Sequence, residues 1–490
     1  MFMGTGSDVG KSLIVAGLCR AFVNRGLKTM PFKPQNMSNN AAVTKDGGEI
    51  GRAQALQALA AKTAPMTAMN PVLLKPEHES GAQVVVRGKR VATMSAAEYF
   101  SKREQYLPDV MKAFDQVCAD ADLVLIEGAG SASEINLRHN DIANFGFARA
   151  ANVPVIIIGD IQRGGVIASL VGTFNVIDLK DAELVAGTLI NRFQGDPDLF
   201  KQGLKQIEQK TGRPCLGPVP HFEQANLLPA EDILGLETPG SKTQANKILI
   251  VVPRLPRIAN FDDLDPLKMM PEVELIIVPP GQPLPLNADL IILPGSKSTR
   301  ADLDFLRKEG WDIDIAAHAR GGGKILGICA GFQMLGQSIA DPEGVEGIPG
   351  TSPGLGLLEV NTTMATAKQL RVENSFDAQF DCPLTGYHMH MGQTEGPDCE
   401  HPFSVSGDTF EGAISPDTNI MGTYLHGLFA ADDFREKFVA DLTGRNVSPM
   451  NYEARIEQVL DNLAEHLEQY LDLDVLLEMA QPQPDKAQNG

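Results

Sequence analysis

Short apolar runs alternate with longer amphipathic stretches along most of the chain. In the first half, the runs at 123–126, 153–159 and 187–190 contain no regular polar positions. A strand with one face in water alternates polar and apolar residues, whereas a strand covered by helices on both faces does not. The first half therefore predicts an α/β domain with a buried parallel sheet.

This rhythm stops in a polar, turn-rich stretch at 226–246, which we interpret as a linker. It then resumes with further apolar runs at 248–252, 274–278, 290–293 and 324–328. These runs predict a second α/β domain.

The pattern divides the chain into segments. We predict one domain at 1–225, a second at 247–445, a helical extension at 446–480 and a disordered tail at 481–490. Within the extension, apolar residues recur at three- and four-residue spacing: Ile456, Val459, Leu460, Leu463, Leu467 and Leu471. That spacing gives one apolar helix face, which we expect to pack on the protein itself.

Composition narrows the classes of partner. The 490 residues include 62 acidic and 42 basic side chains, and the net charge of −20 disfavours nucleic acid and anionic membranes. No apolar run approaches the roughly 20 residues of a membrane-spanning helix, and the first residues lack the pattern of a signal peptide. The six cysteines form no Cys-x-x-Cys pair, so we expect free thiols and a cytoplasmic protein.

The segment Gly4-Thr-Gly-Ser-Asp-Val-Gly-Lys-Ser12 lies between a short apolar start and a helix-like stretch. In a phosphate-binding loop, glycines let backbone N–H groups converge on a nucleotide, a lysine reaches the terminal phosphates and a hydroxyl ligates Mg²⁺. We assign these roles to Gly4, Thr5, Gly10, Lys11 and Ser12, with ATP and Mg²⁺ as cofactors. The alternative is a glycine-rich turn without a ligand.

Two strand ends add charged candidates. Glu127 ends an apolar run and is placed for Mg²⁺ at the carboxyl edge of the sheet. Arg163 follows another strand, where it could bind a phosphate or a substrate carboxylate. Turn capping by Glu127 and a surface ion pair of Arg163 are the alternatives.

The segment 31–54 is rich in amides, charges and glycines, which is typical of substrate-binding loops. Lys33, Asn36 and Gln54 are the candidate substrate residues. Asp46 in the same segment is a further candidate metal ligand. A solvated loop is the alternative for the whole segment.

The motif Lys324-Ile-Leu-Gly-Ile-Cys-Ala-Gly331 predicts an apolar strand, a tight turn and a helix. Such a nucleophile elbow exposes the side chain of Cys329, and the helix N-terminus stabilises its thiolate. The N–H of Ala330 and the loop at Gly295 are candidate donors to an oxyanion. The alternative is a buried structural cysteine.

A thiol nucleophile needs a base, and His426 in Gly422-Thr-Tyr-Leu-His-Gly-Leu-Phe429 is the first candidate. His388 and His390 are its rivals. Their two-residue spacing puts both on one face of a strand, where they could instead bind a metal.

In their order along the chain, these motifs resemble the cobyric acid synthase family. The resemblance rests on the phosphate loop, the Cys329 elbow and three further segments: Phe32-Lys-Pro-Gln-Asn-Met37, Ile126-Glu-Gly-Ala-Gly-Ser131 and Tyr424-Leu-His-Gly427. It implies an N-terminal P-loop domain of the dethiobiotin-synthetase type and a C-terminal class I glutamine amidotransferase-like α/β domain.

The resemblance also implies a function. A glutamine-hydrolysing, ATP-dependent synthetase would amidate the b, d, e and g carboxylates of adenosylcobyrinic acid a,c-diamide to give adenosylcobyric acid in cobalamin biosynthesis. Cys329 would attack glutamine, His426 would shuttle the proton, and ammonia would pass to the N-terminal domain. A polycarboxylate substrate needs local cations, and the candidates are Lys33, Lys75, Arg87, Arg138 and Arg163.

Two positions depart from the expected patterns. Leu428 stands where ordinary class I glutaminases carry a glutamate two residues after the histidine, which predicts a Cys–His dyad with a poorly positioned imidazole. His388 stands where the family pattern has a glutamate. Two other functions stay open: the sister enzyme cobyrinic acid a,c-diamide synthase, and a nucleotide-switched partition-type ATPase with a degenerate glutaminase. The oligomeric state is open as well.

Overall fold

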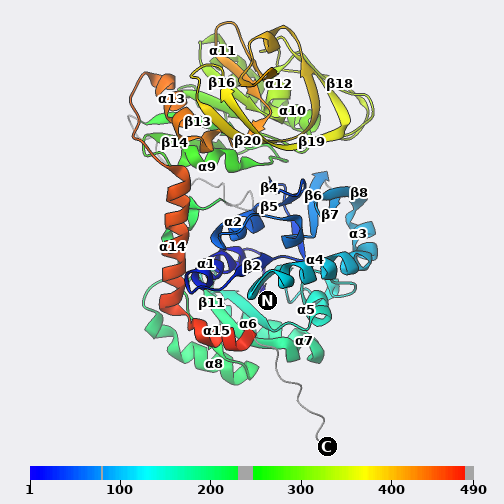
Figure 1. Cartoon of the computed structure of the whole chain (residues 1–490), viewed down its shortest axis with the longest axis vertical. Coiled ribbons are helices and arrows are strands. Elements are labelled where there is room, and N and C mark those ends of the chain that lie inside the picture. Colours follow the sequence, from blue (N-terminus) through cyan, green and yellow to red (C-terminus); the bar gives the residue numbers. More distant parts are fainter. Residues whose placement is uncertain (79–80, 230–246, 481–490) are drawn as a thin grey trace, which may run out of the picture.

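Two α/β domains are stacked along the long axis of the molecule, and helix α14 (Tyr452–Tyr470) runs from the second domain down the side of the first (Figure 1). The computed structural model describes residues 1–78, 81–229 and 247–480. The predicted disordered tail and most of the predicted linker lie outside these residues. No helix within the described ranges is both long and apolar enough to cross a membrane.

The first domain is built on a parallel sheet, as predicted. In spatial order its strands are β12 (Cys215–Leu216), β11 (Val185–Asn191), β10 (Val155–Asp160), β1 (Phe2–Gly4), β9 (Leu123–Ser131) and β2 (Thr29–Phe32). The apolar runs at 123–126, 153–159 and 187–190 fall in three of these strands. Because helices cover both faces, separate apolar clusters form on the two sides of the sheet.

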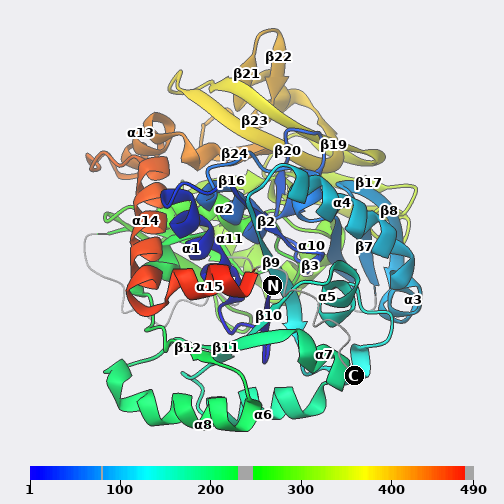
Figure 2. The same cartoon turned by 60° about the horizontal axis from the view of Figure 1, so that its bottom comes forward.

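Helices of this domain follow the strands in alternation. They are α1 (Lys11–Asn24), α2 (Arg52–Ala60), α3 (Ala96–Lys102), α4 (Leu107–Ala119), α5 (Phe145–Ala151), α6 (Val166–Val176), α7 (Leu179–Leu184) and α8 (Lys201–Thr211). Figure 2 shows α6 and α8 side by side near β11 and the edge strand β12.

A smaller sheet lies between this domain and the second one. Its strands are β3 (Gln35–Met37), β6 (Val72–His78), β7 (Gly81–Val86) and β8 (Lys89–Ser95), and a hairpin of β4 (Ala41–Val43) and β5 (Glu49–Gly51) lies beside it. These strands were not predicted from the sequence. They bring the first domain into contact with the second, since Ala41, Leu73 and Val85 share an apolar cluster with Met389.

The second domain has a predominantly parallel sheet. Its strands are β14 (Val273–Val278), β13 (Ile248–Pro253), β15 (Leu290–Leu293), β16 (Lys324–Ile328), β24 (Ile420–Thr423) and the antiparallel edge strand β23 (Ala413–Ile414). All the apolar runs predicted for this half are strands of this sheet. Its helices are α9 (Asp265–Lys268), α10 (Thr299–Lys308), α11 (Trp311–Arg320), α12 (Ala330–Leu335) and α13 (Asp432–Thr443).

A second sheet of this domain was not predicted. It is centred on the long antiparallel pair β19 (Asn361–Asp377) and β20 (Pro383–Glu395). The other strands are β17 (Ser338–Asp341), β18 (Gly350–Pro353), β21 (Ser404–Ser406), β22 (Thr409–Glu411) and β25 (Leu425–His426).

The predicted C-terminal helix packs on the protein itself, as expected. The side chain of Asn451 caps α14 by accepting a hydrogen bond from the N–H of Ala454. The apolar face of α14 is buried against α1, where Gly17 leaves room for Leu463 and Leu467. A last helix, α15 (Leu473–Ala480), follows. The C-terminal extension is therefore part of the core of the first domain.

Candidate active sites

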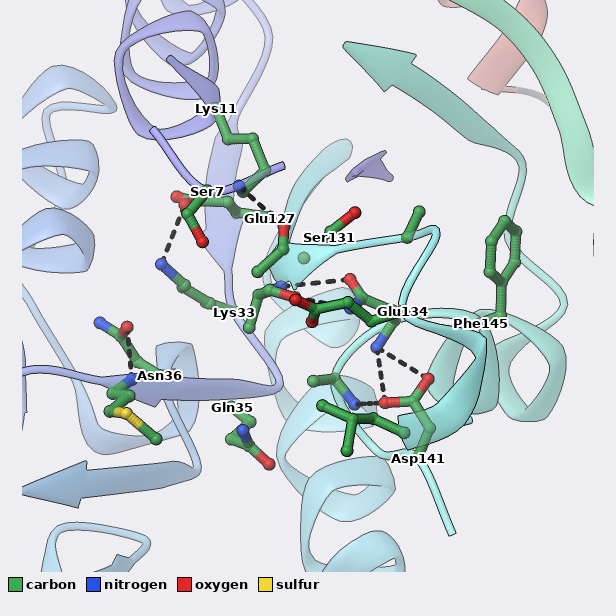
Figure 3. Close-up of a pocket in the computed structure, with 18 of the residues that line it drawn as sticks. Ser7, Lys11, Lys33, Gln35, Asn36, Glu127, Ser131, Glu134, Asp141 and Phe145 are labelled. Atoms are coloured by element: carbon green, nitrogen blue, oxygen red, sulfur yellow. Dashed lines mark hydrogen bonds and ion pairs between the residues drawn. The ribbon is translucent and has the colours of Figure 1, made fainter. Parts of the chain in front are cut away.

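A cavity of about 420 Å³ opens at the carboxyl edge of the first sheet (Figure 3). Its lining includes Lys11 and Ser12 at the start of α1, Lys33 after β2, Asn36 on β3 and Glu127 on β9. These elements converge because parallel strands present their carboxyl ends at one edge of the sheet. The sequence-predicted phosphate loop and two of the four predicted substrate residues, Lys33 and Asn36, thus meet in one place.

The loop between β1 and α1 has the conformation of a phosphate cradle. Gly10 precedes α1 at a φ of 88°, and a Cβ there would overlap the side-chain amide of Asn191. A Cβ on Gly4 would come within 3.1 Å of Lys11 Nζ. Lys11 Nζ donates to the carbonyl oxygens of Gly6 and Gly130 at 3.1 and 3.0 Å. The lysine therefore folds over the loop, where it can meet phosphate oxygens.

Glu127 is the centre of a buried polar cluster below this loop. Its Oε1 accepts from Ser12 Oγ at 2.8 Å and lies 2.9 Å from Lys33 Nζ, as Figure 3 shows for the lysine. Its Oε2 accepts from Gln57 Nε2 at 2.6 Å. A carboxylate and a hydroxyl side by side at the end of a phosphate loop fit Mg²⁺, which prefers oxygen ligands and keeps part of its coordination for phosphates and water.

The other predicted site residues of this domain lie at different distances from the cavity. Thr5 belongs to the loop, and its N–H donates to Ile158 O at 2.9 Å. Gln54 lies behind the cavity and accepts from Asn36 Nδ2 at 2.9 Å. Asp46 lies away from the cavity and accepts from Thr67 Oγ1 at 2.6 Å, and Arg163 is exposed. The structure brings neither Asp46 nor Arg163 to the nucleotide cavity.

The candidate cations for binding a polycarboxylate substrate also differ in whether they line the cavity. Lys33 and Arg138 line the cavity, but Arg138 makes two hydrogen bonds to the carboxylate of Asp181. Lys75 is buried against Glu49 at 2.5 Å, outside the cavity. Arg87 bonds Gln116 on the surface. Lys33 and Arg138 are therefore the two hypothesised cations that line the cavity, and each is paired with a carboxylate.

A second site lies in the other domain, where Cys329 occupies the predicted turn between β16 and α12. Its φ is 54°, an uncommon value for a residue with a side chain. The turn is tight because a Cβ on Gly331 would overlap the carbonyl oxygen of Leu293. The N–H of Cys329 donates to Thr423 O at 2.8 Å. The predicted strand, turn and helix are confirmed.

His426 lies beside this cysteine and is fully buried. Its Nδ1 is 2.7 Å from Asp263 Oδ2, and the ring of Tyr387 stacks on the imidazole at a centroid distance of 5.2 Å. Burial by itself lowers the pKa of His426, but the charge of Asp263, its hydrogen bond and the neighbouring Cys329 raise it to about 10. Asp263 and Cys329 therefore favour the charged form of the imidazole.

The predicted dyad without an orienting carboxylate is wrong. Leu428, at the position of the usual glutamate, is buried and cannot orient the imidazole. Asp263 instead supplies a carboxylate from the short turn Phe261–Leu264. Its second oxygen accepts from the N–H of Gly427 at 2.6 Å. Sequence reasoning missed Asp263, although one signal was available: it follows β13, at the same edge of the sheet as the Cys329 turn.

The pocket at Cys329 includes residues of both domains. Ala330, Ser296, Lys297 and Gln333 come from the second domain, and Gln83 comes from β7 of the first. The other predicted oxyanion residue, Gly295, lies beside His426, since a Cβ on it would be 3.3 Å from His426 Cε1. The structure therefore brings Cys329, His426, Ala330 and Gly295 together.

His388 and His390 are uncharged side chains in the neighbouring sheet. Burial lowers the pKa of each to about 3. His390 stacks on Tyr424 at 3.8 Å and is hydrogen-bonded through Nδ1 to Gly392 O at 2.9 Å. Across the parts of the chain that the structure describes, no cluster of three His, Cys, Asp or Glu residues could hold a metal ion. His390 lines the pocket of Cys329, and His388 Nε2 lies 3.1 Å from Glu373 Oε2.

Family profiles divide the chain as the fold does. The CobQ/CobB/MinD/ParA nucleotide binding domain family matches residues 1–234. The CobB/CobQ-like glutamine amidotransferase domain family matches residues 249–434. With the two sites described above, these matches define a class: a glutamine-hydrolysing amide synthase with a nucleotide-binding domain and a glutaminase domain on one chain.

Full-length relatives narrow the class. The chain is 56% identical over 481 residues to the cobyric acid synthase of Cereibacter sphaeroides, covering 98% of this chain and 99% of that protein. It is 55% identical to the cobyric acid synthases of Methylorubrum populi and Rhodobacter capsulatus, again covering 98% of this chain and 99% of each relative. The chain belongs to the cobyric acid synthase family.

Proposed function

We propose that this enzyme amidates the b, d, e and g carboxylates of adenosylcobyrinic acid a,c-diamide, using ATP and glutamine, to give adenosylcobyric acid in the cytoplasm. Relatives named cobyric acid synthase, similar over 98% of the chain, support this proposal. The observation that carries it is the placement of both sites in one molecule, with Gln83 of the nucleotide-binding domain in the pocket of Cys329. Ammonia is thus released against the domain that consumes it.

In the glutaminase half of the reaction, Cys329 attacks the amide carbon of glutamine as a thiolate. His426, charged beside this thiolate, donates its proton to the leaving nitrogen, so that ammonia departs and a glutamyl thioester remains. The N–H groups of Ala330 and Gly295 stabilise the oxyanion of the tetrahedral intermediate. Water then hydrolyses the thioester to glutamate and the free thiol.

In the synthetase half, Lys11 and the loop residues Gly4, Thr5 and Gly10 bind the phosphates of ATP. Ser12 and Glu127 would hold Mg²⁺, which would supply positive charge to offset that of the phosphate oxygens. The γ-phosphoryl group passes to a corrin carboxylate to form an acyl phosphate, and ammonia displaces phosphate to form the amide.

Three residues are proposed to serve the corrin substrate. Lys33 meets a substrate carboxylate at the cavity wall, and the Asn36 side chain faces the same space. Gln54 holds the amide of Asn36 from behind. The short distance between Lys33 and Glu127 keeps the cation beside the atoms that react.

The first experiment measures the reaction directly. The protein is incubated with ATP, Mg²⁺, glutamine and adenosylcobyrinic acid a,c-diamide, and the amides on the corrin are counted by mass spectrometry. We expect successive additions that end when all four carboxylates are amidated. Inertness toward this substrate with amidation of cobyrinic acid would instead identify the sister enzyme, cobyrinic acid a,c-diamide synthase.

The second experiment separates an amidotransferase from a nucleotide-switched partition-type ATPase. Cys329→Ala removes the proposed nucleophile, so glutamine-dependent amidation should fall to background while amidation with ammonium chloride is kept. Replacement of Cys118, an exposed cysteine that lines neither the nucleotide cavity nor the Cys329 pocket, serves as the control. Equal use of glutamine by Cys329→Ala and the unaltered enzyme would refute the proposal.

A further inference from the structure

Arg52 is a buried arginine of the nucleotide-binding domain that reaches into the glutaminase domain. It is the first residue of α2, and its guanidinium forms an ion pair with Asp262. The same group donates to the hydroxyl of Tyr387 at 3.1 Å and to Ala41 O at 3.4 Å. One side chain thus ties together the first domain, the turn Phe261–Leu264 and strand β20.

Both glutaminase partners of Arg52 are in direct contact with the residues around His426. Asp262 precedes Asp263, whose carboxylate binds both the His426 ring and the Gly427 N–H. Tyr387 stacks on the His426 ring, with an angle of 18° between the two planes. Arg52 is therefore linked to the edge of the imidazole through Asp262 and Asp263, and to its face through Tyr387.

A further contact from the first domain reinforces this arrangement. The N–H of Ala41 lies 3.4 Å from Asn260 Oδ1, and Asn260 Nδ2 lies 3.4 Å from His426 Nε2. Asn260 has a left-handed conformation and immediately precedes the turn that carries Asp263. Both ends of the imidazole are thus connected to side chains that the first domain contacts.

We propose that Arg52 is a positioning residue for glutamine hydrolysis: from the synthetase domain it fixes the Asp262–Asp263 turn and Tyr387, and through them the orientation of His426. The proposal rests on the roles proposed above for Cys329 and His426. It explains why a glutaminase whose histidine is not followed by the usual glutamate keeps a well-placed base. The orienting carboxylate is held from outside the glutaminase fold.

Helix α2 also reaches the nucleotide cavity with its other residues. Gln54 holds Asn36, and Gln57 donates to Glu127 and to Ser12 O, at 2.6 and 3.4 Å respectively. A single helix of nine residues therefore contacts the proposed Mg²⁺ ligands and the support of the glutaminase base.

The Arg52–Asp262 ion pair is better explained by a positioning role than by a contribution to the stability of the domain interface. The Arg52 and Asp262 side chains are 17% and 10% exposed, and a buried ion pair contributes little net stability compared with an apolar pair. The ion pair matters more for orientation than for stability, because the planar guanidinium contacts several acceptors at once and so fixes their positions. Loss of Arg52 frees the turn and the tyrosine ring together.

The test compares Arg52→Met and Arg52→Lys with the unaltered enzyme. Glutamate release from glutamine is measured in the presence of ATP, Mg²⁺ and the corrin substrate. We expect Arg52→Met to lower kcat about 10- to 100-fold through misplacement of the base. KM for glutamine should be unchanged because Arg52 does not line the Cys329 pocket. Arg52→Lys keeps the charge without the planar fork and should lie between the two.

Amidation with ammonium chloride and a matched control exclude a general structural effect. Ammonia-dependent amidation by Arg52→Met should be unchanged because Arg52 does not line the nucleotide cavity. Arg20 is also buried and links α1 to Asp461 and Glu457 on α14. Arg20→Met should leave the glutaminase kcat unchanged at temperatures where its fold is intact.

Three results would overturn the proposal: an unchanged glutaminase kcat in Arg52→Met, a parallel loss of ammonia-dependent amidation, or an equal loss in Arg20→Met. A failure of the proposed function has a different signature. In that case Cys329→Ala would itself continue to release glutamate, whatever the behaviour of the Arg52 variants.

Discussion

Asp263 binds two consecutive residues with one carboxylate, taking a hydrogen bond from the ring of His426 and another from the backbone of Gly427. This arrangement places Nδ1 of the ring against the carboxylate, while Nε2 lies 3.4 Å from Asn260 Nδ2. It also fixes the backbone that presents the ring. Orientation and protonation of the base therefore depend on the same acidic side chain.

Replacing Asp263 by Asn should change the charge of His426. Burial lowers the pKa of a histidine, and in the native protein Asp263 is the main group that overcomes this effect and raises it to about 10. Without the carboxylate, we expect the pKa to fall below its usual value near 6.5. Resonances of labelled histidine should show a charged ring at pH 8 in the native protein and a neutral one in Asp263→Asn.

The same shift has a consequence for stability. Because the pKa of His426 is raised in the folded state, its contribution is fully present below about pH 6.5 and is lost as the pH rises through about 10. The stability difference between the native protein and Asp263→Asn should therefore shrink between these values, as measured by urea unfolding. A difference that grows with pH would contradict this assignment.

Residues in local motifs could be predicted, and residues brought together by the fold could not. Lys11 and Cys329 each belong to a local strand–turn–helix motif, and the glycines of that motif indicate the backbone conformation of the turn. Asp263 reaches His426 across 163 positions of sequence, and no local pattern marks it. Asp46 and Arg163 were predicted from chemistry alone, and loops rich in charge do not reveal which way they face.

At the scale of elements, the contact between α1 and α14 shows how the C-terminal helix is held. The buried face of α14 packs on α1, and Gly17 allows the close approach of Leu463. Arg20 adds ion pairs to Glu457 and Asp461 at the border of this contact. Apolar packing gives the contact its stability, and the ion pairs fix its register.

Leu463→Ala should destabilise the first domain by about 2–5 kcal/mol, because it removes a fully buried side chain and leaves a cavity. The effect should appear as a lower temperature of thermal unfolding. Glu465→Ala, an exposed change on the same helix, is the control and should have little effect. Equal unfolding temperatures for the two variants would mean that the helix face is not part of the core.

Strands that are buried on both faces were predictable for a physical reason. Strands such as β13 and β16 are covered on both faces and therefore appear as continuous apolar runs. The long strand β19 has mixed exposure along its 17 residues and pairs with β20 at the surface, so its pattern is irregular. One face of the small sheet packs on the first domain and the other meets the second domain, and the local sequence does not record the second contact.

At the scale of the whole molecule, the interface between the domains carries charge as well as apolar surface. Glu49 of the first domain is buried between Lys75 of the same domain and Lys368 of the second, at 2.5 Å from each. Burial alone would raise the pKa of Glu49, but the lysines lower it strongly. Such a buried ion network penalises misaligned docking, which suits a pocket assembled from both domains.

The path of the chain has a further consequence. After completing the glutaminase domain, the chain returns as α14 and becomes part of the core of the first domain. The two halves of the molecule are therefore joined by noncovalent packing as well as by the covalent connection. Two separate polypeptides, 1–229 and 247–490, should therefore assemble when co-expressed and co-purify through one affinity tag. Removing 451–490 from the second piece should abolish this capture. The protein could then be reconstituted from separately altered halves, much as a split reporter is.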